Sequence, residues 1–257
     1  MAGTVRNWFA NPGVAARYAA GRPDVHGPIA DHIRDRLACD GPLARAADAG
    51  CGTGLSARAL QRVAAAVVGV DPSVSMLAEA RARGGPSWVC GLAEALPLAD
   101  ASLDLLTAAC AWHWFDQPVF LDEAVRVLVP DGWLVVYDSD FKGDSSQPAL
   151  LEWLRQDYWS RLVWVERYPF FDSESHRHPR FRLAAQEELR VEMAMTQQEV
   201  KTLITSQAST MGNVEQGFLT LAEAEARLDV GLAPFWSHPD ERRLMCFVSP
   251  LHFLQRR

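Results

Sequence analysis

A short stretch with three glycines, DAGCGTG at residues 48–54, has the residue types of a ligand-binding turn. Glycine lacks a Cβ, so it adopts conformations that other residues avoid and lets a ligand approach the backbone closely. Gly50, Gly52 and Gly54 alternate along the turn, and an acid, Asp48, stands two positions before the first of them. In open α/β sheets, ligands bind just beyond the carboxyl ends of strands. We therefore predict that this turn binds a ligand.

The spacing of these glycines argues against two common phosphate-binding loops. A dinucleotide-binding fingerprint reads GxGxxG and would need a glycine where the chain has Leu55. A Walker loop needs Gly-Lys-Ser/Thr, whereas Leu55-Ser56 follows Gly54 here. An acid followed by GxGxG suits a ligand that carries an ammonium or sulfonium group and no pyrophosphate. S-adenosylmethionine is such a ligand, and Asp48 would add negative potential near its cationic groups.

A second acid, Asp71, ends the apolar segment AVVGVD at residues 66–71. A carboxylate at the end of the second strand can accept hydrogen bonds from both hydroxyl groups of a ribose, as it does in dinucleotide-binding folds. Pro72 follows directly, and Met76 lies one turn into the next predicted helix, where its thioether can pack on an adenine face. These residues extend the predicted S-adenosylmethionine site.

A histidine between two tryptophans, Trp112-His113-Trp114, follows the apolar segment at residues 103–109. An imidazole has an ordinary pKa of about 6.5, so near neutral pH it can take a proton from a hydroxyl or an amine. We predict His113 as a catalytic base and both tryptophans as substrate contacts. The alternative is a packed or an exposed histidine without a catalytic role.

Apolar segments of strand length alternate with helical patterns as far as residue 138. The predicted strands are residues 44–48, 66–71, 87–91, 103–109 and 133–138, and the predicted helices are 12–20, 26–38, 55–64, 73–83 and 116–129. Ser73 is a predicted helix cap, and Asp131-Gly132 a predicted turn. Strands that alternate with helices predict a parallel sheet with helices on both faces.

The alternation ends after residue 138. The sequence then predicts an aromatic-rich helix at 148–165, a looser stretch at 168–180, a strand at 188–196, helices at 196–207 and 220–232, and a last strand at 242–254. We interpret the helical insertions as the substrate side, with Trp153 and Tyr158 as predicted substrate contacts. Because the tryptophans of the first insertion, Trp153, Trp159 and Trp164, recur at a helical period, core packing is an equal alternative.

The composition excludes several classes of partner. The net charge of −7 over 257 residues argues against nucleic acid and against an anionic membrane surface. Five scattered cysteines without a CxxC pair, and an N-terminal sequence without the apolar core of a signal peptide, favour the cytoplasm. His176 and His178 have no third ligand at a supporting spacing, so no metal site is predicted.

Taken together, four segments resemble the class I S-adenosylmethionine-dependent methyltransferases, and most closely the group around the ubiquinone/menaquinone-biosynthesis and trans-aconitate methyltransferases. The segments are DAGCGTG, VVGVDPSVSMLAEAR, GLAEALPLADASLDLLTAACAWHWFD and EAVRVLVPDGWLVVYD. The resemblance covers at least residues 14–138. ARYAAGRPD at 16–24 is similar to the "Y…RP" opening of that group.

The resemblance implies a Rossmann-like, doubly wound sheet of seven strands in the order 3-2-1-4-5-7-6, with the last strand antiparallel. It implies one methyltransferase domain over residues 1–257, made of a helical lid (1–40), a cofactor-binding core (41–138) and substrate-side insertions with the final strands (139–257). The positions that match the cofactor motifs are Tyr18, Arg22, Asp48, Gly50, Gly52, Asp71, Ala93, Glu94 and Ala109 to Ala111. Leu92 departs from the family, which often has an aspartate there for the adenine amino group.

We expect methyl transfer from S-adenosylmethionine to a small molecule, with S-adenosylhomocysteine as the product. The acceptor is either a neutral, partly aromatic compound or a carboxylate. For a carboxylate, an arginine among Arg155, Arg161, Arg167 and Arg180 would matter more than a base. Two other classes stay open: a nicotinamide-dependent oxidoreductase and a non-catalytic S-adenosylmethionine-binding protein.

Overall fold

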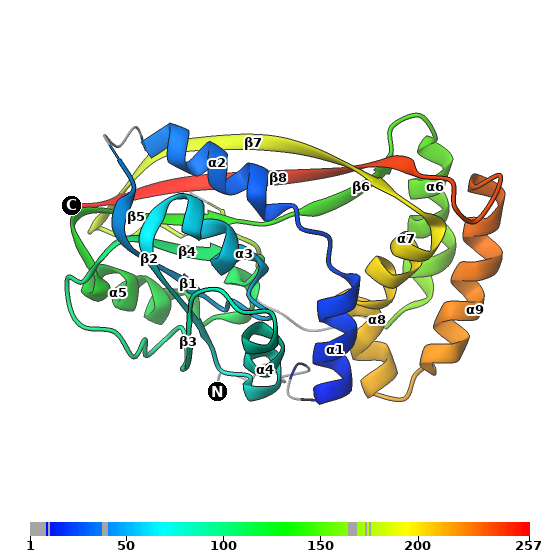
Figure 1. Ribbon diagram of the computed structural model, residues 1–257, viewed down its shortest axis with the longest axis horizontal. Coiled ribbons are helices and arrows are strands. Elements are labelled where there is room, and N and C mark those ends of the chain that lie inside the picture. Colours follow the sequence, from blue (N-terminus) through cyan, green and yellow to red (C-terminus); the bar gives the residue numbers. More distant parts are fainter. Residues whose placement is uncertain (1–8, 10, 38–40, 164–168, 173, 175) are drawn as a thin grey trace. The chain divides into compact units, whose positions relative to one another are not determined.

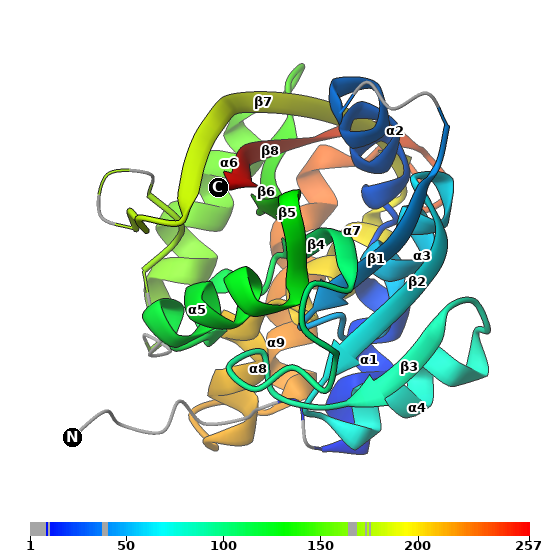
Figure 2. The same ribbon diagram turned by 90° about the vertical axis from the view of Figure 1, so that its left-hand side faces the viewer.

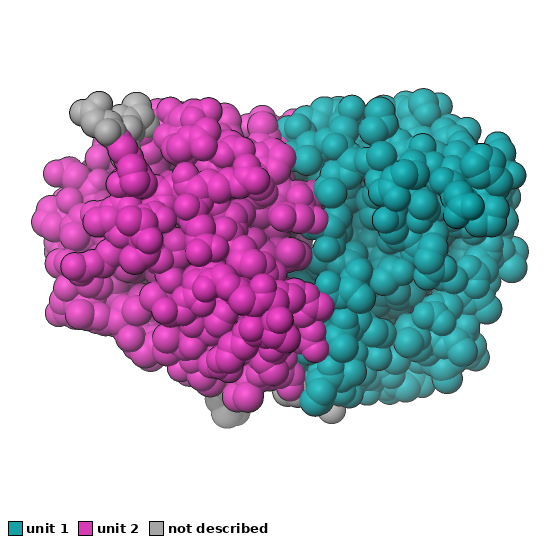
Figure 3. Space-filling view, viewed as in Figure 1, with its two compact units in different colours: residues 1–23, 140–166, 190–248 teal, residues 24–139, 167–189, 249–257 magenta. Residues whose placement is uncertain are grey.

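A computed structural model describes residues 9, 11–37, 41–163, 169–172, 174 and 176–257 (Figure 1). Contacts divide the chain into two compact units, which are described one at a time (Figure 3). Unit 2 holds Asp24–Ser139, Arg167–Leu189 and Ser249–Arg257, and unit 1 holds Met1–Pro23, Asp140–Glu166 and Arg190–Val248. Trp164 and Arg167, two of the residues considered above, lie outside the described residues.

The core of unit 2 is a parallel sheet. Its strands are β1 (Leu43–Ala49), β2 (Ala64–Asp71), β3 (Ser87–Cys90), β4 (Leu103–Ala109) and β5 (Leu128–Tyr137). β1 pairs with β2 and β4, β2 pairs with β3, and β4 pairs with β5, all in parallel. The order is therefore 3-2-1-4-5, as predicted, and all five strands end at the same edge.

The last strand, β8 (Arg243–Arg256), pairs with β5 in antiparallel orientation and also pairs with β7 (Phe181–Met195). With β7 as the sixth predicted strand and β8 as the seventh, the predicted order 3-2-1-4-5-7-6 is confirmed. Strand β6 (Asp140–Asp144) was not predicted separately from the sequence. It continues the pairing of β5 along β8, because Tyr137 pairs with Leu251 and Asp140 with Val248 in the same register.

Helices lie on both faces of the sheet in unit 2, with α5 on one side and α2 and α3 on the other (Figure 2). The elements are α2 (His26–Leu37), α3 (Leu55–Ala59), η2 (Leu60–Arg62), α4 (Val74–Ala82), η3 (Trp112–Trp114) and α5 (Gln117–Val127). The predicted cap is confirmed, because the Ser73 hydroxyl accepts from the N–H of Met76. Asp116 likewise caps α5 through the N–H of Val119.

The sequence reading of residues 128–133 was wrong in one detail. Helix α5 ends at Val127 and β5 already begins at Leu128, whereas the prediction extended the helix to residue 129 and began the strand at 133. Leu128 pairs with Leu103 and Trp133 with Leu105, so the residues between Leu128 and Trp133 form an irregularity in the strand. Asp131, with a φ of +62°, lies within that irregularity, but both Asp131 and Gly132 belong to β5, so the turn predicted there is not confirmed.

Strand β5 presents different residues to the two faces of the sheet because side chains alternate along a strand. Leu134 and Val136 belong to the buried apolar core that also contains Phe120 and Ala124 of α5. The intervening residues therefore point to the face that α2 covers. This alternation carries over to Tyr137 and to Asp138, which follows the strand.

Unit 1 contains the first helix and later helices of the chain. They are α1 (Pro12–Gly21), α6 (Pro148–Trp153), α7 (Gln197–Thr205), α8 (Ala208–Glu215), α9 (Leu221–Leu232) and η6 (Ala233–Phe235). Of these, α8 was not predicted from the sequence. The single helix predicted at 148–165 is wrong in form: α6 changes to a π-helical turn, Leu154–Tyr158, and then to a 3₁₀ turn, Trp159–Arg161. Within the described parts of the chain, no helix has the length and apolarity to cross a membrane.

Candidate functional site

The glycine turn lies at the carboxyl end of β1, in unit 2. Gly50, Gly52 and Gly54 have φ values of +69°, +53° and +83°, a region in which residues with a Cβ are strained. The N–H groups of Gly50 and Cys51 both donate to the carbonyl of Val70, at 2.8 and 3.1 Å. The turn is therefore folded over the end of the neighbouring strand β2.

Two of the three glycines are required by close packing. A Cβ on Gly50 would lie 2.6 Å from the Cβ of Ala111, and one on Gly54 would lie 2.3 Å from the Trp88 ring. A Cβ on Gly52 would approach a single atom among the described residues within 4 Å, the methyl group of Met76 at 3.2 Å. Gly52 is therefore the least crowded of the three glycines, and its role in ligand binding stays a prediction.

Asp71, at the end of β2, is joined directly to this turn. Its Oδ2 accepts a hydrogen bond from the N–H of Gly52 and its Oδ1 accepts one from the N–H of Ser73, both at 2.8 Å. Burial raises the pKa of this carboxyl, and the two N–H groups oppose that effect. Each oxygen keeps a second lone pair, so the carboxylate can still accept from hydroxyl groups of a ligand.

Asp48 lies deeper in the protein, with no exposed surface. Its carboxyl accepts hydrogen bonds from the hydroxyls of Ser56 and Thr107, the latter at 2.6 Å. Burial raises its pKa from 3.8 to about 7, although both hydroxyls favour the charged form, and the nearby Asp71 raises it further. Near neutral pH it is therefore only partly ionised. The predicted negative potential under the turn depends on pH.

The remaining predicted cofactor residues line the same edge with different exposure. Met76, Ala93 and Ala109 are buried, and Pro72 is exposed. Glu94 uses one oxygen to accept from the N–H of Asp116 at 2.7 Å, so its carboxylate is partly committed to the start of α5. Leu92, the residue that departs from the family, is 55% exposed. The roles of these residues in binding stay predictions.

The backbone after β4 is strained at this edge. Cys110 has a φ of +52°, in the left-handed region that is unusual for a residue with a Cβ. Its N–H donates to the carbonyl of Tyr137, at the end of β5, at 2.8 Å. Such strain is often retained where a functional site needs a particular backbone direction. The predicted role of Ala109 to Ala111 beside the cofactor stays a prediction.

His113, the predicted base, is buried and faces a carboxylate. Its Nδ1 lies 3.4 Å from Oδ2 of Asp138, and the two side chains are 7% and 20% exposed. At this distance Nδ1 makes no hydrogen bond among the described residues, so the carboxylate acts on the imidazole through its charge, which would stabilise the imidazolium that forms when the other nitrogen takes a proton. Sequence reasoning missed Asp138. The signal for it was its position as the last residue of a predicted strand, at the same edge as His113.

The two tryptophans beside His113 differ in environment. Trp112 is 1% exposed and packs edge-on against Phe120 and Phe171 in the apolar core. Trp114 is partly buried, and its ring centroid lies 5.1 Å from that of His113. On geometry, Trp114 is the better placed of the two for substrate contact, which remains a prediction for both.

A second buried histidine lies at the same edge and was not singled out from the sequence. His26, the first residue of α2, has its Nδ1 2.9 Å from the hydroxyl of Tyr137. Burial raises the pKa of Tyr137 well above its usual value, so its phenol stays neutral. Tyr137 thus pairs with His26 on one face of the sheet, and Asp138 lies beside His113 on the other face. No sequence motif marks either His26 or Tyr137.

Four other predicted site residues lie in unit 1. The Arg22 guanidinium stacks 4.6 Å from the centre of the Tyr18 ring and donates to the carbonyl of Ser206. Tyr158 is 2% exposed, and its hydroxyl lies 3.3 Å from that of Thr210. The indole of Trp153 packs on α9, where a Cβ on Gly231 would lie 1.7 Å from it. Their contacts with cofactor or substrate stay predictions.

The arginines considered for a carboxylate substrate are exposed where they are described, and their role also stays a prediction. These are Arg155, Arg161 and Arg180. Arg161 pairs with Asp157 at 3.7 Å. Among the residues that the structure describes, no group of three or more His, Cys, Asp or Glu side chains is arranged to hold a metal ion.

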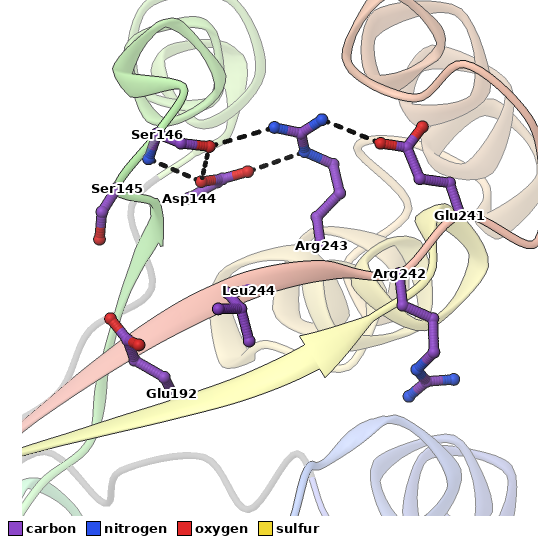
Figure 4. Close-up of a pocket in the computed structure, with 8 residues that line it drawn as sticks. All are labelled: Asp144, Ser145, Ser146, Glu192, Glu241, Arg242, Arg243 and Leu244. Carbon is purple, nitrogen blue, oxygen red and sulfur yellow. Dashed lines mark hydrogen bonds and ion pairs between the residues drawn. The ribbon is translucent and has the colours of Figure 1, made fainter.

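Unit 1 also has a pocket of about 340 Å³, which carries charges of both signs (Figure 4). Its lining residues are Asp144, Ser145, Ser146, Glu192, Glu241, Arg242, Arg243 and Leu244. The Arg243 guanidinium donates to Asp144 at 2.7 Å, to Glu241 at 3.0 Å and to Ser146 at 3.2 Å. The charges of Arg243, Asp144 and Glu241 thus satisfy one another within the pocket.

Known proteins resemble this chain in both sequence and structure. Residues 47–136 match the family described as "Methyltransferase domain". An uncharacterized methyltransferase of Mycobacterium tuberculosis is 39% identical over 120 residues, 46% of each chain. A malonyl-[acyl-carrier protein] O-methyltransferase of Alcanivorax borkumensis is 40% identical over 101 residues, 37% of this chain and 35% of that one.

Among solved structures, a "putative type II methyltransferase" of Anaeromyxobacter dehalogenans has a TM-score of 0.68 and 21% identity, over 91% of this chain and 96% of that one. The chain spans less than half of the length of the curated relatives named above. The residues that match the family, 47–136, contain the glycine turn, Asp71 and His113. The finer resemblance to ubiquinone/menaquinone and trans-aconitate enzymes stays a prediction.

Proposed function

We propose that this chain, a class I methyltransferase by its domain sequence and its fold, transfers a methyl group from S-adenosylmethionine to a small-molecule acceptor. The observation that carries the proposal is the junction of the glycine turn with Asp71. There, an open glycine and a carboxylate with spare lone pairs lie together at the carboxyl edge of the sheet. S-adenosylhomocysteine would be the other product.

The donor fits the residues at this edge. The free side of Gly52 leaves room for the amino-acid end of the donor, and Asp71 can accept from the ribose hydroxyls. Met76 is buried beside Gly52, where it can contact the adenine. The donor supplies an already activated methyl group on a sulfonium. The chain therefore has to bind, align and keep out water, and such positioning can supply on the order of 7–11 kcal/mol of the barrier.

His113 and Asp138 supply proton transfer in this proposal. With Nδ1 toward the Asp138 carboxylate, the remaining nitrogen of His113, Nε2, is left to take a proton from the acceptor. The carboxylate stabilises the resulting imidazolium. This pair matters only for an acceptor that carries a proton on its nucleophilic atom, such as a hydroxyl or an amine.

A carboxylate acceptor is the second candidate. It is supported by the 40% identity over 101 residues to a protein named as a malonyl-[acyl-carrier protein] O-methyltransferase. A carboxylate needs no base, so in this case His113 would be dispensable. Methylation assays with a free dicarboxylate and with a phenol, compared between wild type and His113→Ala, distinguish the two candidates.

We further propose that residues 1–40 act as a lid in a single methyltransferase domain, with core and substrate-side segments as predicted. Helix α1 packs on α7 so closely that a Cβ on Gly21 would lie 2.5 Å from the carbonyl of Thr202. We therefore expect the two helices to respond together. Hydrogen exchange with and without S-adenosylhomocysteine should show added protection over residues 12–24 and 197–205. Equal hydrogen exchange with and without the ligand would contradict the proposed role of these residues as a lid.

Calorimetry with S-adenosylhomocysteine and with NAD, followed by a search for turnover, tests the proposal against the two other classes. Binding of the first ligand and not the second excludes an oxidoreductase that uses NAD. Transfer of a labelled methyl group to any acceptor excludes a purely binding protein. Failure to bind S-adenosylhomocysteine would overturn the proposed function.

A further inference from the structure

In unit 2, the glutamine Gln117 holds in place a short aromatic segment, which contains Phe170 and Phe171 and lies beside His113. Gln117, the first residue of α5, is 6% exposed. Its Nε2 donates to the carbonyl of Pro169 and its Oε1 lies 2.6 Å from Nε2 of His176, so both amide atoms hold the same segment. A buried amide with both ends bonded in this way fixes the position of the chain that it bonds.

The two aromatic residues of this segment have different environments. Phe171 packs on Trp112 at 4.9 Å and on His252 at 4.5 Å, between ring centroids, and so anchors the segment in the core. Phe170 is 44% exposed, and its ring lies 4.9 Å from the ring of His113. Of the two phenylalanines, Phe170 is thus the one that is exposed and that contacts His113, the predicted base.

Two aromatic rings therefore contact the imidazole of His113. The distance between ring centroids is 4.9 Å for Phe170 and 5.1 Å for Trp114. The ring planes are tilted from that of the imidazole by 59° and 50°. Apolar aromatic surface beside a polar group is typical of sites for small organic molecules. A flat acceptor that lay against these rings would present a substituent to the imidazole.

The charge near His113 favours an uncharged acceptor. Among the described residues, the carboxylate of Asp138 is charged and lies 3.4 Å from the imidazole. A carboxylate acceptor brought to the same place would meet a like charge in a partly buried environment, where such repulsion is strong. A neutral hydroxyl would not.

We propose that the methyl acceptor is a flat, uncharged aromatic hydroxyl compound held against Phe170 and Trp114, with Phe170 as a specificity-determining residue and Gln117 as its positioning residue. This inference rests on the proposed methyltransferase function. The acceptor O–H proton would pass to Nε2 of His113, the acceptor oxygen would form the new bond to the methyl carbon, and the carbon–sulfur bond of the donor would break. S-adenosylhomocysteine would leave with the electron pair as a neutral thioether.

The test uses two ligands that differ in charge on the same ring system, 2-naphthol and 2-naphthoate. Each is measured by equilibrium dialysis against the full chain saturated with S-adenosylhomocysteine. We expect 2-naphthol to bind more tightly than 2-naphthoate. We expect Phe170→Ala to weaken 2-naphthol binding about tenfold, the effect of losing a favourable aromatic contact. Phe218→Ala, which also removes an exposed phenylalanine, is the matched control and should leave binding unchanged.

Gln117→Ala tests the positioning role. It should weaken 2-naphthol binding to a similar degree, and the double variant should be no weaker than either single one, because both changes remove the same contact. Affinity for S-adenosylhomocysteine should stay at the wild-type value in all three variants. A purely structural role for Gln117 would instead lower the affinities for both ligands together.

Several outcomes would overturn the inference: no binding of 2-naphthol, equal binding of 2-naphthoate, or no effect of Phe170→Ala. Calorimetry with S-adenosylhomocysteine keeps this failure separate from failure of the proposed function. If that ligand binds and 2-naphthol does not, only the acceptor assignment is wrong. If S-adenosylhomocysteine does not bind, the methyltransferase proposal falls as well.

Discussion

The backbone N–H of Gly52 donates a 2.8 Å hydrogen bond to Oδ2 of Asp71, which joins the turn after β1 to the end of β2. This bond connects the glycine turn with the acid at the end of β2, although the two residues are 19 positions apart in the sequence. The carboxylate both shapes the turn and faces the proposed ligand. A substitution at either residue will therefore act on the backbone as well as on binding, and each experiment needs a control that separates the two effects.

Asp71→Asn should weaken S-adenosylhomocysteine binding and also lower stability, because the amide nitrogen would face the N–H of either Gly52 or Ser73. The amide keeps one acceptor oxygen but loses the charge that strengthens the bonds from the ribose, each worth about 1.5–3 kcal/mol, or roughly tenfold or more in affinity. Asp71→Ala should weaken binding further. Calorimetry measures both, with Asp35→Asn on the exposed surface of α2 as the control. Unchanged affinity in Asp71→Ala would remove this residue from the site.

Gly52→Val should abolish cofactor binding but leave a folded chain. The new side chain would fill the open side of the turn and press on Met76, and the positive φ adds a strain of about 1–2 kcal/mol. Gly84→Val is a matched control, because Gly84 has a φ of +70° and nothing within 4 Å of its missing Cβ. Both variants should lose similar stability in urea unfolding. Normal binding by Gly52→Val would show that the glycines make only a tight turn.

The sequence predicted the sheet well because its signals are local. The apolar segments that became β2 and β4 are read from a few consecutive residues, and the order of the strands follows from the family resemblance. Leu128 was misread because apolar periodicity does not reveal where α5 stops and an irregular strand begins. The π-helical turn at Leu154–Tyr158 was missed for a similar reason, since its pattern is close to that of an α-helix.

The site was predictable only where its residues lie in motifs. Asp71 and Gly52 were found, but the hydrogen bond between them depends on the pairing of β1 with β2. The contacts of Asp138 with His113 and of Tyr137 with His26 join segments that are distant in the sequence. Without the fold, nothing in the residue types indicates these pairs.

Asp48 should make the free energy of unfolding depend on pH. Its pKa is about 7 in the folded chain and about 4 when unfolded, so between these values the folded state holds the extra proton. The free energy of unfolding should therefore fall as pH rises from about 4 to about 7, by at most about 1.4 kcal/mol per unit, and be flat outside that window. Asp48→Asn does not titrate, so it should lack this contribution.

Urea unfolding of both proteins at about pH 5 and about pH 8 tests this prediction. The difference in stability between wild type and Asp48→Asn should shift by about 2–3 kcal/mol between the two pH values, against the wild type at the higher one. The comparison cancels the other titrating groups. A difference that is the same at both pH values would show that Asp48 stays ionised throughout, in spite of its burial between Ser56 and Thr107.

His113→Ala should lower turnover by roughly 10²–10⁴ with little change in affinity for S-adenosylhomocysteine, because a base acts on the acceptor and not on the donor. The pH–rate profiles of wild type and variant should differ, because only the wild type has the proposed base. Asp138→Asn should also lower turnover, since the carboxylate 3.4 Å from the imidazole would no longer stabilise the imidazolium.

The double variant of His113 and Asp138 decides whether the two residues act together. If Asp138 works only through His113, then His113→Ala combined with Asp138→Asn should be no slower than His113→Ala alone. Additive losses would instead give the carboxylate a separate role, such as direct contact with the acceptor. A pH–rate profile on an acceptor that the wild type methylates completes the test. Wild-type turnover and an unchanged profile in His113→Ala would leave alignment of acceptor and donor as the whole of the catalysis.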